Sequence, residues 1–250
     1  MYYKVLRDFQ SCQGGNFDWS EYLPKGKRPG KWTPPVDDVI ACLRGYHGCT
    51  AEQLPWWITG GNMVFEMEYR TPPTPSGNKV VGSQMRLLRR VGHGESVGGI
   101  VFALDDILHV SGNERCIAYG RSTIIARDAS TVEAHDASTV GSYDFSTVQT
   151  YGRSTVRSHD ASTVQAYDFS NVEAYDRSTV TANGSSTVTA YDSSTVIARG
   201  RSAVSAKDSS TVTAKDRSTV TVWSRYVRYE IYDSAVVIDR SDGKLTIHTA

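Results

Sequence analysis

The chain has 250 residues, and its 27 basic and 27 acidic side chains give a formal net charge of zero. A neutral chain lacks the strong positive field that draws proteins onto nucleic acids or anionic membranes, so we expect neither partner. There is no apolar run of eighteen residues, and the charged opening MYYKVLRDFQ lacks the apolar core of a signal peptide. We therefore expect a cytoplasmic or virion-associated protein.

The first hundred residues differ from the rest in composition, since they hold all eight prolines and four of the five tryptophans. MYYKVLRDF and NMVFEMEYR are rich in aromatic and branched residues and predict strands, and a third strand is expected near Tyr46. TAEQLPWWI predicts a short helix with Thr50 as its N-cap, while NKVVGSQMRLLRRVG fits a strand or a helix. We predict a small α+β domain over residues 1–97 and a transition or N-terminal cap over residues 98–119.

Four polar residues of this domain suggest an enzyme. Arg7, His47, Glu66 and Glu68 loosely resemble the Arg, His and Glu positions of ADP-ribosyltransferase-like folds, which implies a nicotinamide site. Their spacing matches no strict motif, and charges at strand ends with a locally bonded turn histidine explain the same residues. We expect no enzyme activity and no cofactor, and we keep ADP-ribosyl transfer as an alternative.

Cysteines of the same domain suggest a metal site. Cys12, Cys42, His47 and Cys49 could form a Cys₃His zinc site, but the Cys-x₄-His-x-Cys spacing is not that of standard zinc knuckles. A Cys42–Cys49 disulfide and reduced thiols are the other two states, and reduced thiols are favoured. We expect no bound metal.

A family resemblance covers residues 1–92. The pattern GKWTPPVDDVIACLRGYHGCTAEQLPWWI, followed by VFEMEY and NKVVGSQMRLLR, resembles an uncharacterised domain of bacteriophage and actinobacterial proteins that often precedes repeat tails. The shared features are the turn from Cys42 through Gly45-Tyr46-His47, the Trp-bearing helix, the strand ending in Glu, and Lys79 with Arg86. The resemblance implies a phage or prophage context and supplies no activity.

The remaining chain is dominated by an eight-residue repeat. Between residues 120 and 223 the pattern D/G–x–S–T–V–x–A–x occurs thirteen times without a slip. Ser, Val and Ala lie two residues apart, which is the alternation of a strand with one buried face, and Asp or Gly marks a corner. Eight residues are too few for a helical repeat, so the period predicts a β-solenoid.

The glycines indicate how many octads close one coil. Gly120, Gly152, Gly184 and Gly200 replace Asp, and all four fall on one sixteen-residue phase. We therefore predict a mainly β protein with a two-sided solenoid, two octads per coil and about six and a half coils. At roughly 4.8 Å per coil, the rod would be about 30 Å long.

The residue types of the octad predict how the rod is held together. Inward Ser hydroxyls should bond to backbone carbonyls or to one another. Each corner Asp should cap a backbone N–H; one carboxylate per corner is too few for calcium. The corner tyrosines should stack in rows along the rod; these are Tyr143, Tyr151, Tyr167, Tyr175 and Tyr191.

The repeat carries a second resemblance. SSTVTAYDSSTV is similar to the octapeptide-based sixteen-residue repeats of bacterial ice nucleation proteins, which implies a β-solenoid whose Thr-x-Thr rows order water. On the sixteen-residue scheme the first Thr forms an unbroken row on one face, and the complete Thr-x-Thr pairs divide between the two faces. The candidate binding residues are Thr131, Thr147, Thr163, Thr179, Thr181, Thr195, Thr211 and Thr213.

The last segment, residues 224–250, breaks the octad and adds bulky aromatic residues, so we predict a C-terminal β cap with a hairpin turn at Ser241–Lys244. The main functional hypothesis is a non-enzymatic scaffold that presents a repetitive Thr, Tyr and charged surface. Its expected partners are a second copy at the solenoid ends or another protein. Ice binding through the Thr rows is the first alternative.

Overall fold

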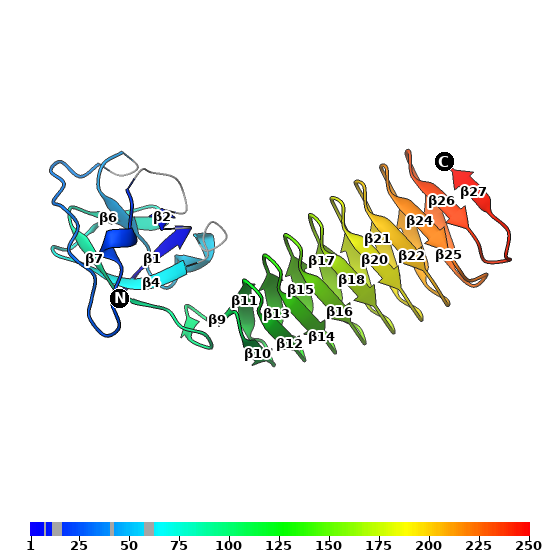
Figure 1. Cartoon of the computed structure of the whole chain (residues 1–250), viewed down its shortest axis with the longest axis horizontal. Coiled ribbons are helices and arrows are strands. Elements are labelled where there is room, and N and C mark those ends of the chain that lie inside the picture. The colour runs from blue at the N-terminus through cyan, green and yellow to red at the C-terminus, as the bar shows by residue number, and fades with distance from the viewer. Residues whose placement is uncertain (8, 12–16, 41–42, 58–62) are drawn as a thin grey trace. The chain divides into compact units, whose positions relative to one another are not determined.

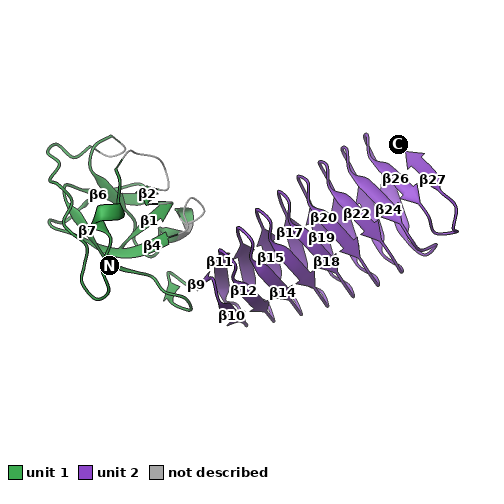
Figure 2. Cartoon of the chain, viewed as in Figure 1, with its two compact units in different colours: residues 1–100 green, residues 101–250 purple. Residues whose placement is uncertain are grey.

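The computed structural model describes residues 1–250 except 8, 12–16, 41–42 and 58–62 (Figure 1). It divides into two compact units, residues 1–100 and 101–250 (Figure 2). The regular secondary structure of each unit consists almost entirely of strands.

The first unit contains two antiparallel sheets. Its elements are β1 (Tyr2–Arg7), β2 (Gln10–Ser11), η1 (Ser20–Tyr22), β3 (Tyr46–Gly48), η2 (Leu54–Trp56), β4 (Met63–Tyr69), β5 (Thr74–Ser76), β6 (Lys79–Gly82), β7 (Met85–Arg90) and β8 (Ser96–Val97). One sheet has the order β2-β1-β4-β7 and the other β3-β6-β5. Leu6, Trp19, Phe65 and Met67 belong to the buried core of this unit.

The structure corrects the predicted α component of this unit. Among the described residues the only helices are the 3-10 helices η1 and η2. The predicted helix at Thr50 is the short η2, whose N-cap is Gln53 rather than Thr50. Gln53 Oε1 accepts a bond from the N–H of Thr50 at 3.0 Å, which satisfies the turn without a longer helix. The ambiguous segment after Asn78 forms two strands, β6 and β7.

The second unit is the predicted two-sided β-solenoid. The octads form the thirteen strands β12 (Thr123–Ala126), β13 (Thr131–Ala134), β14 (Thr139–Ser142), β15 (Thr147–Thr150), β16 (Thr155–Ser158), β17 (Thr163–Ala166), β18 (Asn171–Ala174), β19 (Thr179–Ala182), β20 (Thr187–Ala190), β21 (Thr195–Ala198), β22 (Ala203–Ala206), β23 (Thr211–Ala214) and β24 (Thr219–Val222). Even-numbered strands form one parallel sheet and odd-numbered strands the other, which confirms sixteen residues per coil (Figure 1). We call them the even sheet and the odd sheet.

The stack is longer than the octads predict. Towards the N-terminus it includes β9 (Ile100–Leu104), β10 (Ile107–Val110) and β11 (Arg115–Tyr119), and Cys116 and Ala118 pair with Val132 and Ala134. Towards the C-terminus it includes β25 (Arg228–Ile231) and β26 (Val236–Asp239). The predicted six and a half coils are therefore too few, because the parallel register tolerates sequences that have lost the Ser-Thr-Val signature.

The C-terminal segment closes one sheet. Strand β27 (Thr246–Thr249) pairs antiparallel with β26, and the predicted hairpin turn lies between them. One residue is inserted before β25, since Thr211 pairs with Arg228 rather than with the residue sixteen places on. The segment is thus a β cap, as predicted, although its first two strands still belong to the coil.

The core between the two sheets is narrow and built from small side chains. The inward Val and Ala side chains of the octad strands are almost completely buried. Cys116 occupies a Val place, and burial raises the pKa of its thiol to about 12. Such a core contains little apolar area per residue, so the hydrogen-bonded ladders and the corners must contribute much of the stability.

The hydrogen bonds of the inward serines agree with the prediction only in part. Most of the Ser hydroxyls donate to the carbonyl three residues earlier, as Ser138 does to His135 O at 2.7 Å. Ser142 and Ser158 instead bond to the next inward Ser. The prediction is wrong for Ser130, Ser178, Ser194 and Ser202, whose buried Oγ atoms have no partner in the described part of the chain.

Candidate functional site

The candidate Thr row lies on the odd sheet. Thr131, Thr147, Thr163, Thr179, Thr195 and Thr211 are paired in direct register from β13 to β23, so the predicted unbroken row is confirmed. The first two are half-buried and the last four are exposed. Regular strand pairing therefore presents hydroxyl and methyl groups at one strand spacing along this face.

The second outward row of the odd sheet is mixed. It runs Glu133, Gln149, Gln165, Thr181, Ile197 and Thr213, so Thr181 and Thr213 are separated by an isoleucine. The other two complete pairs, on β20 and β24, lie on the even sheet as expected. The structure therefore brings the eight candidate residues onto one face but yields only one continuous row.

Aromatic side chains form a ladder along each edge, which confirms the predicted tyrosine rows. At the corner that follows the even strands, the rings of Tyr143, His159, Tyr175 and Tyr191 stack with centroid distances of 4.7–5.1 Å. Arg127 and Lys207 lie over the two terminal rings. At the other corner Tyr119, His135, Tyr151 and Tyr167 stack in the same way. His135 and His159 were not predicted to join these ladders, although they occupy the same octad position as the tyrosines.

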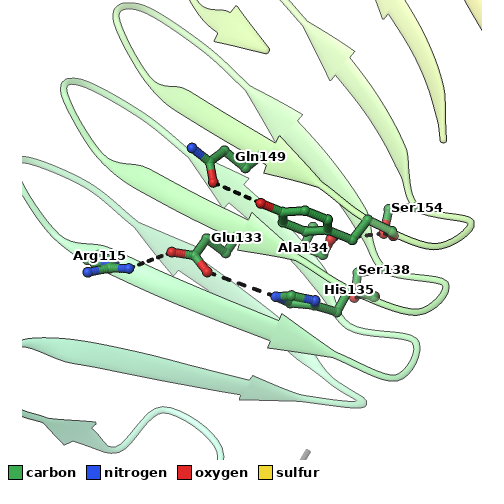
Figure 3. A network of polar contacts seen from close by, with 8 residues as sticks. Arg115, Glu133, Ala134, His135, Ser138, Gln149 and Ser154 are labelled. Carbon is green, nitrogen blue, oxygen red and sulfur yellow. Dashed lines mark hydrogen bonds and ion pairs between the residues drawn. The ribbon is translucent and has the colours of Figure 1, made fainter. Parts of the chain in front are cut away.

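His135 belongs to a small polar network beside its ladder (Figure 3). Arg115 forms an ion pair with Glu133, and Glu133 Oε2 lies 4.0 Å from His135 Nε2. Burial lowers the pKa of His135, although Glu133 and Asp136 oppose the shift. The imidazole is therefore held neutral between two tyrosine rings, and the network is a structural element of the edge.

The corner aspartates cap backbone amides, as predicted. Each carboxylate reaches back one coil and accepts the N–H of the corresponding corner residue; Asp192 Oδ2 lies 3.2 Å from the N–H of Asp176. The capping aspartates have positive φ angles of 50–60°. No group of three metal-binding side chains occurs among the described residues.

The candidate enzyme residues of the first unit are not brought together. Glu66 pairs with Arg89 and Glu68 with Arg86, both across β4 and β7. Arg7 lies at the far end of β1, four residues beyond Tyr3, the residue that pairs with Glu66. His47 lies in β3, and burial together with Lys79 and Lys4 lowers its pKa. The four side chains thus occupy three separate positions.

The candidate metal residues are described only in part. Cys12 and Cys42 lie outside the described residues. Cys49 is buried, and its Sγ lies 3.6 Å from the carbonyl oxygen of Tyr3. In the described segments no helix is long and apolar enough to span a membrane.

Comparison with known proteins found no match among family models, curated proteins or solved structures.

Proposed function

We propose that the chain is a non-enzymatic scaffold in which a rigid β-solenoid presents a repeated polar surface for assembly or binding. The observation that supports it is the continuous coil-to-coil strand pairing from β10 to β26, with aspartate caps and stacked rings at both edges. Each coil is fixed by its neighbours through backbone ladders, which suits a stiff support. The resemblance of residues 1–92 fits a phage or prophage setting for this scaffold.

A scaffold of this kind should change length without losing its fold. Inserting a second copy of residues 147–194 adds three coils in phase, so the solenoid should lengthen by about 14 Å. Small-angle scattering of the full chain measures the increase in maximum dimension. In the control, deletion of residues 167–178 leaves an eight-residue strand without a corner and should disrupt the stack. Misfolding of the insertion variant would contradict a modular scaffold.

Ice binding is a second candidate, and the register of the Thr row supports it. We expect faceted ice crystals or a raised droplet freezing temperature with the wild type, lost in the double variant Thr163→Lys, Thr179→Lys. The control is Thr187→Lys, Thr219→Lys on the even sheet, where Asn171 and Ala203 interrupt the row. Wild-type behaviour identical to buffer excludes this candidate.

A further inference from the structure

The corner aspartates show that an anionic group can bind the backbone at the edge of the solenoid. At these corners the backbone N–H points along the stack, and a carboxylate oxygen from the next coil binds it at 2.9–3.3 Å. A left-handed corner with an outward N–H is a general anion-binding arrangement of backbone. The repeat thus carries its own anion at most corners.

Two adjacent coils have lost this anion. Gly184 and Gly200 occupy the same corner position in two successive coils, after β19 and β21. Gly200 has no carboxylate that could bind the backbone N–H of Gly184. A Cβ built on Gly200 would lie 3.2 Å from the nitrogen of Gly184 and 2.9 Å from its oxygen, directly over that peptide. Gly184 is exposed. Its amide therefore faces a place without a carboxylate, as do the amides of Asp136 and Asp168, which lie one coil before Gly152 and Gly184. The Gly184 corner differs from these two in the charged residues beside it.

Four cationic residues lie next to this corner in the sequence and on the following coil. Arg199 and Arg201 flank Gly200, and Lys215 and Arg217 flank Asp216 one coil later. Backbone bonds stack the two coils directly, with Arg217 N–H on the carbonyl of Gly200 at 3.0 Å. The three arginines are exposed and none of the four cations forms an ion pair in the described structure, while Lys215 lies over the ring of Tyr232.

Stacking like charges at one strand spacing is unfavourable unless an anion shares the site. The corners at Gly200 and Asp216 together carry these four cationic residues and only one carboxylate, that of Asp216, which already binds the N–H of Gly200 at 2.9 Å. Asp233 follows on the next coil and ends the basic stretch. The surface is therefore too short to follow a nucleic-acid backbone but large enough for one or two anionic groups.

We propose that this corner binds a tetrahedral oxyanion, a phosphate or sulfate group, on the amide of Gly184 between the side chains of Arg199 and Arg201, with Lys215 and Arg217 supplying further charge. Guanidinium groups bind such oxyanions through paired N–H donors, and the open amide supplies a fixed third contact. The proposal is independent of the scaffold role, because it concerns one edge and two coils.

The sharpest test gives the corner its own carboxylate. Gly200→Asp introduces the residue that other corners carry at a similar φ, so the fold should be retained while the site is occupied from within. Calorimetric titration of the full chain with inorganic phosphate, pyrophosphate and sulfate, at ionic strength matched with chloride, should show binding that Gly200→Asp weakens at least tenfold. Arg199→Gln combined with Arg201→Gln should also weaken it.

Gly152→Asp is the matched control, since it adds the same carboxylate three coils away on the same edge and should leave binding unchanged. Absence of binding to all three anions, or equal binding by the wild type and Gly200→Asp, overturns the proposal. A sulfated polysaccharide and polyphosphate test the source of the group. Binding more than tenfold tighter than pyrophosphate indicates a polymer, and comparable binding indicates a free ion; either result requires loss in Gly200→Asp.

Discussion

Each corner aspartate serves the solenoid in two ways at the scale of one residue. It adopts the left-handed backbone that few residues other than Gly, Asn and Asp enter readily, and its carboxylate caps the amide one coil earlier. Asp192 does both, with φ of 53° and a 3.2 Å bond to Asp176 N–H. Glycine at four corners keeps the backbone conformation and omits the cap, which explains why the sequence alternates between only these two residues.

These two contributions can be separated at Asp192. Asp192→Gly loses only the cap and should cost about 1 kcal/mol, whereas Asp192→Ala also forces a methyl group into the left-handed region and should cost about 2–3 kcal/mol. Urea unfolding of both variants measures the difference. Equal losses would show that the backbone conformation contributes nothing at this corner.

Protonation of His135 should couple the edge to pH. Burial lowers its pKa below the unfolded value of about 6.5, so the unfolded chain takes up the proton first as the pH falls. The stability that the neutral ring contributes is therefore present above about pH 6.5 and is lost as the pH falls through the folded pKa.

His135→Tyr, which continues the stack between Tyr119 and Tyr151, should reduce the loss of melting temperature between pH 7 and pH 5.5. His159→Tyr changes the other ladder but retains His135, so its acid-linked loss should remain. If both variants follow the wild type throughout this range, the buried histidine is not the coupled group.

At the scale of elements, the period was sufficient to predict the octad strands, their in–out alternation and the sixteen-residue coil. The four corner glycines are separated by multiples of sixteen residues. This spacing distinguished a coil of two octads from a coil of three, because a given corner position occurs only once per coil. Strands β9, β10 and β25 could not be predicted in this way, since they join the stack through backbone register alone. In the first unit, the local sequence around Val80 and Leu87 fits a strand or a helix. The strand conformation is selected by pairing, of β6 with β3 and of β7 with β4.

The candidate site was predictable to a similar extent. Register follows from the period, so the row from Thr131 to Thr211 could be inferred without coordinates. The solvent exposure of these threonines could not be inferred from the period, because it depends on the neighbouring side chains of each coil. The uncapped amide of Gly184 could not be inferred from the sequence either, because the sequence does not show that each corner aspartate binds a backbone N–H of the preceding coil.

The aromatic ladder is the element that should tie several coils together. Tyr175 stacks on His159 at 4.7 Å and on Tyr191 at 4.8 Å, so its removal interrupts the ladder at the centre. Tyr175→Ser should cost about 1–3 kcal/mol from two ring contacts and lost burial. Phe169→Ser is the control, since this exposed ring lies at a corner tip outside the ladders. Thermal unfolding should separate the two variants by several degrees.

For the solenoid as a whole, stability should be distributed along one dimension. Each coil contacts only its neighbours, so opening starts at the ends, where β10 and β25 have a neighbour on one side only. Hydrogen exchange should be slowest in the central strands, from about β15 to β21, and faster towards both ends.

Two matched substitutions test this one-dimensional coupling. Val188 and Val237 are both fully buried inward residues, the first in central β20 and the second in β26, next to the last strand of the even sheet. Loss of two methyl groups costs about 1–2 kcal/mol at either site. Val237→Ala should therefore accelerate exchange about tenfold in β24, β26 and β27 only, since these strands open together without the rest. Val188→Ala should leave exchange at both ends unchanged and accelerate it only in the centre, where opening requires breaking the stack. Uniform acceleration along the solenoid by Val237→Ala would instead show that the rod unfolds as a single unit.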